Sequence, residues 1–222
     1  MFRRTPTLPP PRDFGWTLRS VEDAETAIGT LADGRMELTI RHEVLTGIEV
    51  DMLVWWFQHV DGATVYQGAE YPLYFLWHPR DHISVSLGRN EAGRVAPGQT
   101  IHICEAFARD PRFLIDQAVT IHQWDAQGVG FHVDMFGRQV MSLEHHFEPA
   151  PGGVQYKSCM RLGMEGAAWM KTFNRWVLPR KFPLEKAQAW LRHNVEEVGC
   201  FVDFLPTVYA DAMNASAEPS RN

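Results

Sequence analysis

Apolar and polar residues alternate with a period of two over much of the middle of the chain, from residue 71 to about residue 162. This period is typical of strands that bury one face, because successive side chains of a strand point to opposite sides. Turn-forming residues interrupt the alternation at Pro79, Gly88, 96–98, Gly128, Gly137 and 151–153. The pattern predicts a meandering antiparallel sheet of about six or seven strands. Residues 36–44 alternate in the same way and add a further strand.

Helical periodicity occurs in three segments, namely residues 50–60, part of 164–177, and a long stretch from Pro183 to about residue 205. Proline is favourable in the first turn of a helix, so Pro183 is a suitable starting residue for the last of these segments. Together the elements predict an α+β fold of the helix-grip type, the Bet v 1/START-like architecture. In that fold a strongly curved antiparallel sheet wraps around a long C-terminal helix and leaves a cavity between them.

The length of 222 residues suits one large domain with short extensions. We expect residues 1–30 to form an N-terminal arm, whose first half is rich in Pro and Arg, and residues 31–211 to form a single helix-grip domain. The polar residues 212–222 are expected to be a loose tail. No internal repeat or low-complexity linker divides the middle of the chain.

Charge and composition argue against several classes of protein. The net charge is −6 without a concentrated basic patch, which disfavours a general nucleic-acid-binding protein. No apolar run of about 18 residues is present to span a membrane, and no apolar stretch follows the basic N-terminus as in a secretory signal. Cys104, Cys159 and Cys200 lack zinc-finger or redox spacing, which fits free thiols. We therefore expect a cytoplasmic protein that binds neither nucleic acid nor a membrane, and a homodimer is left open.

One face of the long C-terminal helix carries a histidine and a glutamate. His193 and Glu197 are four residues apart, so their side chains project about one turn apart on the same side. This side lies outside the aliphatic stripe of the helix and outside its polar sector, to which Glu196 belongs. It lies beside aromatic residues such as Trp190 and Phe204. A buried carboxylate needs a partner, and a metal ion is the simplest one, since imidazole and carboxylate suit zinc. The same spacing is common on ordinary helix surfaces, which remains the alternative.

Alternation also places polar residues on apolar faces of the predicted strands. Glu105 shares a face with Ile101 and Ile103, which is unusual for a carboxylate. A strand buried on both sides, or a bulge, would also explain it. His145 lies on the apolar face of its strand, and Tyr156 lies on the inner face of the next strand of a predicted hairpin. A lone histidine on an apolar face is more often a core residue whose ring nitrogens are hydrogen-bonded than a functional residue.

Two nearby histidines compete for one inward position. His78 is in phase with Tyr74, whereas His82 is in phase with Ser84, on the face opposite the apolar residues Ile83, Val85 and Leu87. We therefore expect His78 to point inward as a metal ligand and keep His82 as a substitute ligand or a supporting residue. Asp81 either orients an imidazole or serves as a turn residue before the strand.

These assignments bring four side chains towards one cavity, from two regions of the sheet and from the helix. They are His78, Glu105, His193 and Glu197. Two imidazoles and two carboxylates suit Zn²⁺, and iron or manganese is also compatible. Water or a substrate oxygen could fill an open coordination position.

Several short motifs make this chain similar to a known family. They are His42-Glu43-Val44-Leu45, Trp55-Trp56-Phe57, Trp77-His78-Pro79-Arg80-Asp81-His82, Leu143-Glu144-His145-His146-Phe147 and His193-Asn194-Val195-Glu196-Glu197. Over about residues 40–204 the chain resembles the diacetylphloroglucinol hydrolases, including the phloretin hydrolase group. The resemblance implies zinc bound by two histidines and two glutamates, and it maps these ligands to His78, Glu105, His193 and Glu197. The spacing between His78 and Glu105 must be adjusted to match the spacing of the family's ligands. His82 therefore remains an alternative ligand.

The resemblance also implies an activity, namely hydrolysis of a carbon–carbon bond between an acyl group and a phenolic ring or in another β-diketone. Such a retro-Claisen reaction would use Zn²⁺ or another divalent transition metal. Its partner would be a small aromatic or polyketide substrate that resembles an acylphloroglucinol. His145 and Tyr156 resemble residues near the substrate hydroxyls, and His82 is a further catalytic candidate. Candidate substrate-binding residues, for which plain core packing is the alternative, are Tyr74, Trp77, Trp190 and Phe204.

Two other functions remain compatible with the sequence. The first is a non-catalytic helix-grip protein that binds an apolar or aromatic small molecule. The second is a metal-free polyketide cyclase or dehydratase that uses His145 and Tyr156 as acid and base. A stoichiometric metal ion would count against the first, and full activity after metal removal would favour the second.

Overall fold

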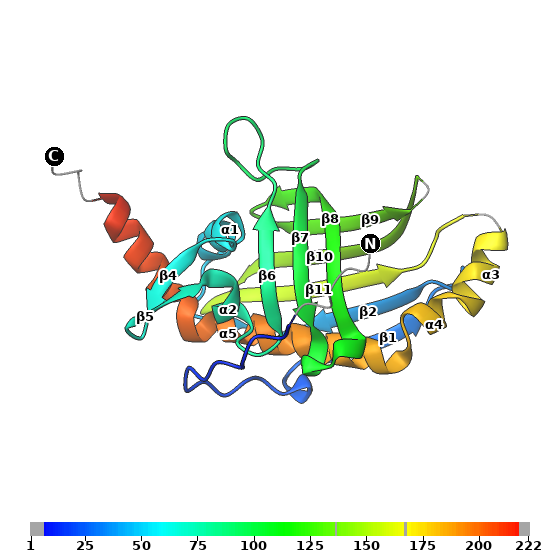
Figure 1. The fold of residues 1–222 in the computed structure, drawn as a ribbon, viewed down its shortest axis with the longest axis horizontal. Coiled ribbons are helices and arrows are strands. Elements are labelled where there is room, and N and C mark those ends of the chain that lie inside the picture. The colour runs from blue at the N-terminus through cyan, green and yellow to red at the C-terminus, as the bar shows by residue number, and fades with distance from the viewer. Residues whose placement is uncertain (1–6, 136, 167, 218–222) are drawn as a thin grey trace.

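One strongly curved antiparallel sheet dominates the computed structural model, which describes residues 7–135, 137–166 and 168–217 (Figure 1). Its strands are ordered β1 (Glu25–Thr30), β2 (Met36–Arg41), β11 (Gly153–Leu162), β10 (Arg138–Ala150), β9 (Gly128–Met135), β8 (Leu114–Asp125), β7 (Thr100–Ala106) and β6 (His82–Leu87). The short β3 (Leu45–Thr46) pairs with β11 and completes this nine-stranded sheet. A separate hairpin consists of β4 (Ala63–Tyr66) and β5 (Ala69–Pro72).

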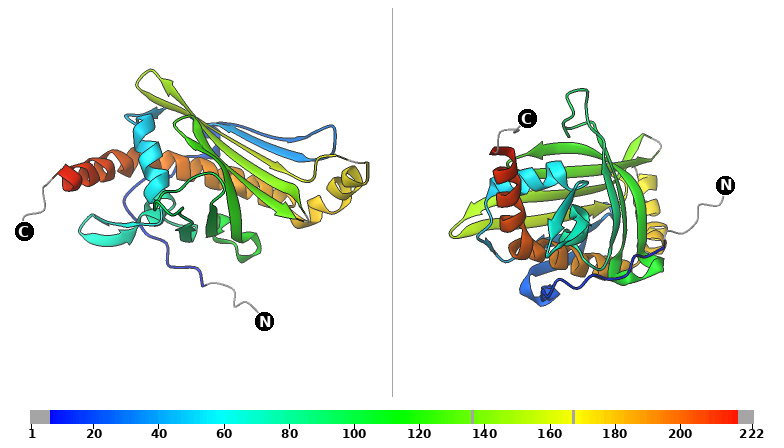
Figure 2. Two further views of the ribbon diagram at one scale, coloured as in Figure 1. Left: turned by 90° about the horizontal axis from the view of Figure 1, so that it is seen from above. Right: turned by 60° about the vertical axis from the view of Figure 1, so that its left-hand side comes forward.

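The sheet curls around α5 (Leu184–Ala217), the longest helix (Figure 2). The other helical segments are α1 (Val50–His59), α2 (Leu73–Trp77), α3 (Ala168–Trp176), α4 (Leu178–Lys181) and the 3₁₀ turns η1 (Val21–Asp23), η2 (Phe107–Arg109) and η3 (Pro111–Phe113). A curved antiparallel sheet around a long C-terminal helix is the predicted helix-grip fold, which the structure confirms.

Most predicted elements occur close to their expected positions. The period-two region forms the strands from β6 to β11, and residues 50–60 contain α1. The ends of the chain differ from expectation, because β1 lies within the predicted arm and pairs in full register with β2. The helix α5 likewise continues through Ala217, into the predicted tail. Residues 1–6 and 218–222 of the predicted arm and tail lie outside the described residues.

The segment before β6 is the main departure from the predicted pattern. Residues Leu73–Trp77 form α2, although they lie in the region with strand-like alternation. Four of its five residues are buried, so the apolar run carries no helical period that a sequence could reveal. A bulge then shifts the β6–β7 register between His82 and Ser84. Because a one-residue shift exchanges the two faces of a strand, His82 and Ser84 point to opposite sides.

The hairpin of β10 and β11 fixes the positions of several inward residues. Ala150 pairs with Gly153, so the connection is the two-residue turn Pro151-Gly152. A Cβ atom on Gly153 would lie 2.1 Å from the carbonyl oxygen of Leu45, so the close approach of β3 requires glycine there. The resulting register places His145 of β10 directly opposite Ser158 of β11.

Buried apolar residues form two clusters, and α5 contributes to both. Its N-terminal half contributes Ala187, Trp190, Leu191 and Val195 to one cluster. Its next turns contribute Val198, Cys200, Phe201, Phe204, Leu205 and Val208 to the other. The polar positions His193 and Glu197 therefore lie where the two apolar clusters meet.

The cysteines Cys104, Cys159 and Cys200 are free thiols, as their spacing predicts, and two of them are buried. Among the described helices, none combines the length and the apolar character needed to cross a bilayer.

Candidate metal centre and adjoining cavity

Four polar side chains from two strands and one helix meet between the sheet and α5. His82 begins β6, Glu105 lies near the end of β7, and His193 and Glu197 lie on α5. The Nε2 atom of His82 lies 3.3 Å from Oε2 of Glu197 and 3.5 Å from Oε2 of Glu105. The Nε2 atom of His193 lies 3.6 Å from each of these two oxygens. We call this set the four-residue cluster.

Hydrogen bonds fix the hydrogen of each cluster imidazole on Nδ1. In His82, Nδ1 lies 2.7 Å from the carbonyl oxygen of Tyr74, which can only accept a hydrogen bond. In His193, Nδ1 lies 3.0 Å from Oδ2 of Asp81, and this carboxylate also accepts. A neutral imidazole then has a lone pair on Nε2. Both Nε2 atoms are buried and have no hydrogen-bond partner among the described residues.

The electrostatics of the cluster favour a cation at its centre. Buried nitrogen lone pairs that face carboxylate oxygens repel them unless a positive charge lies between. Burial opposes ionisation of Glu197, yet the nearby His193 and His82 hold the pKa of that carboxyl well below its usual range. Burial also opposes the charged form of His193, but Glu105 and Glu197 raise its pKa well above the usual value. The two carboxylates thus favour a positive charge at Nε2 of His193, either a proton or a metal ion that replaces it. Two imidazoles and two carboxylates therefore fit a divalent transition metal such as Zn²⁺.

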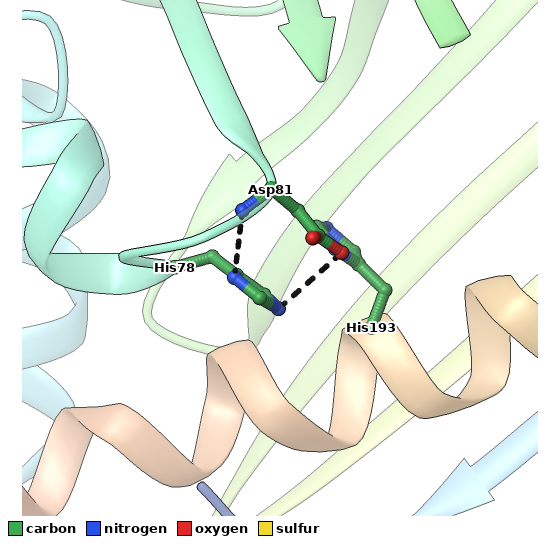
Figure 3. Close-up of side chains that lie close together, drawn as sticks. All are labelled: His78, Asp81 and His193. Carbon is green, nitrogen blue, oxygen red and sulfur yellow. Dashed lines mark hydrogen bonds and ion pairs between the residues drawn. The ribbon is translucent and has the colours of Figure 1, made fainter. Parts of the chain in front are cut away.

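His78, the histidine that alternation favours as a ligand, lies beside Asp81 and His193 (Figure 3). Its hydrogen-bond partners differ from those of the cluster histidines. Its Nδ1 accepts from the backbone N–H of Asp81 at 3.2 Å, so the hydrogen of a neutral ring is on Nε2. That Nε2 donates to Oε2 of Glu196 at 3.1 Å. An imidazole in this tautomer has no free lone pair for a metal ion. The geometry thus favours His82 over His78, although His78, Asp81 and His193 lie close enough to hold an ion by distance alone.

Asp81 links the two histidines, in the orienting role considered for it. Its Oδ2 accepts from Nδ1 of His193, and its carboxylate also accepts from the backbone N–H groups of Ala108 and Arg109. Burial would raise the pKa of Asp81, but the hydrogen bond from His193 and the electrostatic effect of the nearby His78 ring hold it at about 2. Asp81 therefore acts as a fixed acceptor that sets the orientation of the His193 ring.

Two further side chains hold the carboxylates of the cluster. The hydroxyl of Tyr74 donates to Oε2 of Glu105 at 2.7 Å, and the Tyr74 ring stacks on His82 with a centroid distance of 3.6 Å. The amide of Asn194 donates to Oε1 of Glu197. Tyr74 was expected to bind substrate. In the structure it holds Glu105 through a hydrogen bond and His82 through ring stacking.

Glu196 is a buried residue that helical periodicity misplaces. The predicted polar sector of the helix includes it, but its exposed fraction is only 7%. One carboxylate oxygen accepts from His78, and the other accepts from Arg192 at 2.7 Å. No periodic signal distinguishes such a residue, because its burial depends on the loop between α2 and β6.

A cavity of about 490 Å³ lies between the sheet and the N-terminal half of α5. Glu105 lies in its wall, so the cavity adjoins the four-residue cluster. The remaining wall is largely apolar and includes Phe107, Phe131, Leu143, Met160 and Trp190. A cavity of this size with few polar groups suits a small aromatic ligand.

The four predicted substrate-binding residues occupy different places. Trp190 lines the cavity. Trp77 and Phe204 lie instead in the larger apolar cluster, where both pack against Trp56. For these two residues the structure favours the core-packing alternative.

His145 and Tyr156 lie near the cluster but outside the wall of this cavity. Both are buried, and their ring centroids are 5.4 Å apart. Burial, together with the charge of Glu197, raises the pKa of Tyr156 well above its usual value. The Tyr156 hydroxyl is buried without a hydrogen-bond partner among the described residues, so it can accept a new contact with a ligand. Nδ1 of His145 lies 3.0 Å from Oγ of Ser158, a serine that sequence patterns give no reason to select.

A family model named DAPG hydrolase PhiG domain matches residues 17–210 of the chain. The chain belongs to this family. The match includes all four residues of the cluster and most of the described fold, and it agrees with the resemblance found in the sequence motifs. None of the curated proteins matches the chain.

Several solved structures are similar in fold at low sequence identity. A protein from Nitrosomonas europaea is 12% identical with a TM-score of 0.47, and the alignment covers 81% of this chain and 99% of that chain. A protein from Mycobacterium smegmatis is 13% identical with a TM-score of 0.44, covering 81% and 98%. A STAR-related lipid transfer protein fragment from Xanthomonas axonopodis is 14% identical with a TM-score of 0.41, covering 82% and 98%.

Proposed function

We propose that this protein is a metal-dependent hydrolase that cleaves the carbon–carbon bond between an acyl group and a phenolic ring, on an acylphloroglucinol-like substrate. The observation that carries the proposal is the pair of buried Nε2 atoms of His82 and His193. They face Glu105 and Glu197 and have no hydrogen-bond partner among the described residues. Membership of the DAPG hydrolase family supports the same reaction class.

In this proposal His82, Glu105, His193 and Glu197 hold the metal ion. When bound, a Zn²⁺ ion supplies Lewis acidity for an acyl carbonyl and lowers the pKa of water towards neutrality. Asp81 fixes the ring of His193, and Tyr74 fixes Glu105. These contacts limit the movement of the ligands, which favours a site of defined geometry.

The cavity beside Glu105 would hold the phenolic ring. Phe131, Leu143 and Trp190 give it apolar walls that exclude bulk water from the acyl group. Trp190 can stack on an aromatic ring. The position of Glu105 in the same wall would bring the acyl carbonyl next to the ligand cluster.

His145 and Tyr156 lie behind the cavity wall, so in this proposal the bound substrate displaces part of that wall and brings its ring atoms to them. Cleavage requires a proton at the ring carbon that loses the acyl group, and it requires removal of a proton from the water that adds to the carbonyl. Burial lowers the pKa of His145 to about 4, and the nearby Glu197 carboxylate opposes this shift. His145 is therefore neutral near pH 7 and can both donate and accept a proton. Tyr156 would donate its free hydroxyl to a ring oxygen.

The test is hydrolysis of diacetylphloroglucinol by the purified, zinc-loaded protein, with product analysis by liquid chromatography. We expect release of acetate and the monoacylated phenol, and a loss of at least about 100-fold in kcat for Glu197→Gln. Substrate binding without cleavage would instead identify a carrier. Full turnover after complete metal removal would identify a metal-free enzyme, and either result would reject the proposal.

A further inference from the structure

Ser158 of β11 lies between two buried histidines. Its Oγ atom is 3.0 Å from Nδ1 of His145 and 3.2 Å from Nε2 of His42. The exposed fractions of His42, Ser158 and His145 are 5%, 2% and 3%. His42 belongs to a sequence motif that the proposed function leaves without a role.

The chemistry of a hydroxyl group restricts how these three side chains share hydrogens. Ser158 has one hydrogen and can donate it to only one imidazole. The other imidazole must then carry a hydrogen on the facing nitrogen and donate it to Oγ. The chain from His42 to His145 therefore has two arrangements, which differ in the tautomer of both histidines.

One end of this chain is close to solvent and the other is close to the candidate site. His42 lines a surface recess of about 20 Å³ together with Asp23 and Glu43, which has room for about one water molecule. At the other end, the ring of His145 lies 5.4 Å from that of Tyr156. The hydrogen-bonded chain thus connects the protein surface at His42 to the buried His145.

Burial keeps both histidines neutral near pH 7, although nearby carboxylates oppose it. Burial lowers the pKa of His145 to about 4; Glu197 and Glu105 oppose this shift, and His146 adds to it. Burial lowers the pKa of His42 to about 3, and the repulsion that a protonated His145 would exert adds to this shift. The carboxylate of Glu197 and a hydrogen bond with the side chain of Asn194 oppose it. Neutral imidazoles can exchange hydrogens along the chain without separating charge in the protein interior.

We propose that His42 and Ser158 form a proton relay between solvent and His145, an inference that rests on the proposed hydrolase function. His145 gives the hydrogen on Nε2 to the ring carbon of the substrate, so that an N–H bond breaks and a C–H bond forms. Nδ1 of His145 takes the hydrogen of Ser158, and Ser158 takes the hydrogen on Nε2 of His42. Solvent then protonates Nδ1 of His42. All three side chains end neutral, and both histidines have exchanged tautomers.

The reverse transfer completes the cycle. The water that adds to the acyl carbonyl loses one proton, which Nε2 of His145 accepts. Ser158 and His42 pass a hydrogen outward to solvent, and the chain returns to its first arrangement. One proton enters and one leaves in each turnover, so the sum of the two transfers is balanced. In this scheme His145 contacts the substrate, whereas His42 and Ser158 act only through His145.

The relay is tested by single-turnover measurements on zinc-loaded protein with diacetylphloroglucinol, in mixtures of H₂O and D₂O. We expect Ser158→Ala and His42→Gln to slow the chemical step about 100-fold, within the range of a proton-transfer contribution. Substrate affinity and metal content should stay unchanged. In wild type the rate should fall along a curve with increasing D₂O, because several hydrogens move together, and the curve should become a straight line in both variants.

Two comparisons separate a relay from a structural role. Glutamine at position 42 can keep a hydrogen bond to Ser158 but cannot pass a proton, so His42→Gln remains informative if Ser158→Ala unfolds. Ser142→Ala removes an equally buried serine of β10 and should leave the rate unchanged. For His42→Ala, added imidazole should restore the rate, whereas thiazole, which has no N–H, should not.

The outcomes distinguish the relay from the function on which it rests. A wild-type rate and a curved isotope plot in folded His42→Gln would overturn the relay while leaving the hydrolase function intact. A wild-type protein that does not cleave the substrate would overturn the function itself.

Discussion

His82 and Glu105 are direct partners across the β6–β7 ladder, and 3.5 Å separates Nε2 of His82 from Oε2 of Glu105. The bulge after His82 makes this contact possible, because it turns His82 to the face that carries Glu105. Opposite this pair, α5 supplies His193 and Glu197. The ligand cluster thus depends on one local irregularity of the sheet and on one turn of helix.

Metal binding should discriminate between the two neighbouring histidines. We expect His82→Ala to lose bound zinc, because it removes one of the two free imidazole lone pairs. His78→Gln should retain zinc, since His78 already uses both ring nitrogens in hydrogen bonds. The measurement is metal content by mass spectrometry after dialysis against a weak chelator. Loss of zinc from the His78 variant alone would reverse the assignment.

Removing the charge of Asp81 should weaken metal binding without removing a ligand. Oδ2 of Asp81 accepts from His193 and from the backbone N–H of Ala108. Its Oδ1 accepts from the backbone N–H of Arg109. An asparagine has only one acceptor oxygen, so it cannot keep all three contacts, and it carries no negative charge. Loss of such a supporting carboxylate typically lowers metal affinity by about 10–100-fold. Competition with a fluorescent zinc chelator measures the affinity. Asp110→Asn is the matched control, because Asp110 binds Arg112 at the surface.

The fold and part of the site were predictable because they rest on local periodicity. Alternation identified the meander, and helical spacing identified His193 and Glu197 as neighbours. Glu105 was recognisable as a carboxylate on an apolar face. In each case one regular element determined the position of the side chain.

The remaining parts depend on irregular or long-range structure. The choice between His78 and His82 required knowledge of α2 and of the bulge in β6, which a buried apolar run does not reveal. Ser158 became relevant only when the turn at Pro151-Gly152 set its register with His145. Burial of Glu196 depends on a loop far away in sequence, and periodicity therefore assigned it to the polar face.

Filling the cavity should impair substrate binding while sparing the metal site. Leu143→Trp adds volume to a wall residue of the 490 Å³ cavity. We expect KM for diacetylphloroglucinol to rise roughly tenfold, with zinc content unchanged. Val65→Trp, at an exposed position of β4, should leave KM unaltered. An unchanged KM in the Leu143 variant would place the substrate elsewhere.

The ion pair of Asp61 and Arg89 should contribute a pH-dependent increment of stability. The two side chains form a bidentate contact, with distances of 2.6 Å and 2.7 Å, and Asp61 also accepts from the backbone N–H of Leu87. The hydrogen bond from Arg89 is the main cause that lowers the pKa of Asp61 in the folded protein. Because the folded pKa is the lower one, the stabilisation is present above the unfolded pKa of about 3.9 and is lost as pH falls through the folded value.

Asp61→Asn should therefore reduce the free energy of unfolding by about 1 kcal/mol at pH 7, the upper range for a partly exposed pair. The difference between wild type and variant should shrink as pH is lowered below about 4. Urea denaturation of both proteins at several pH values measures it, and comparison of the two cancels the titration of all other groups. A difference that stays constant down to pH 3 would mean that the carboxylate charge of Asp61 does not stabilise the fold.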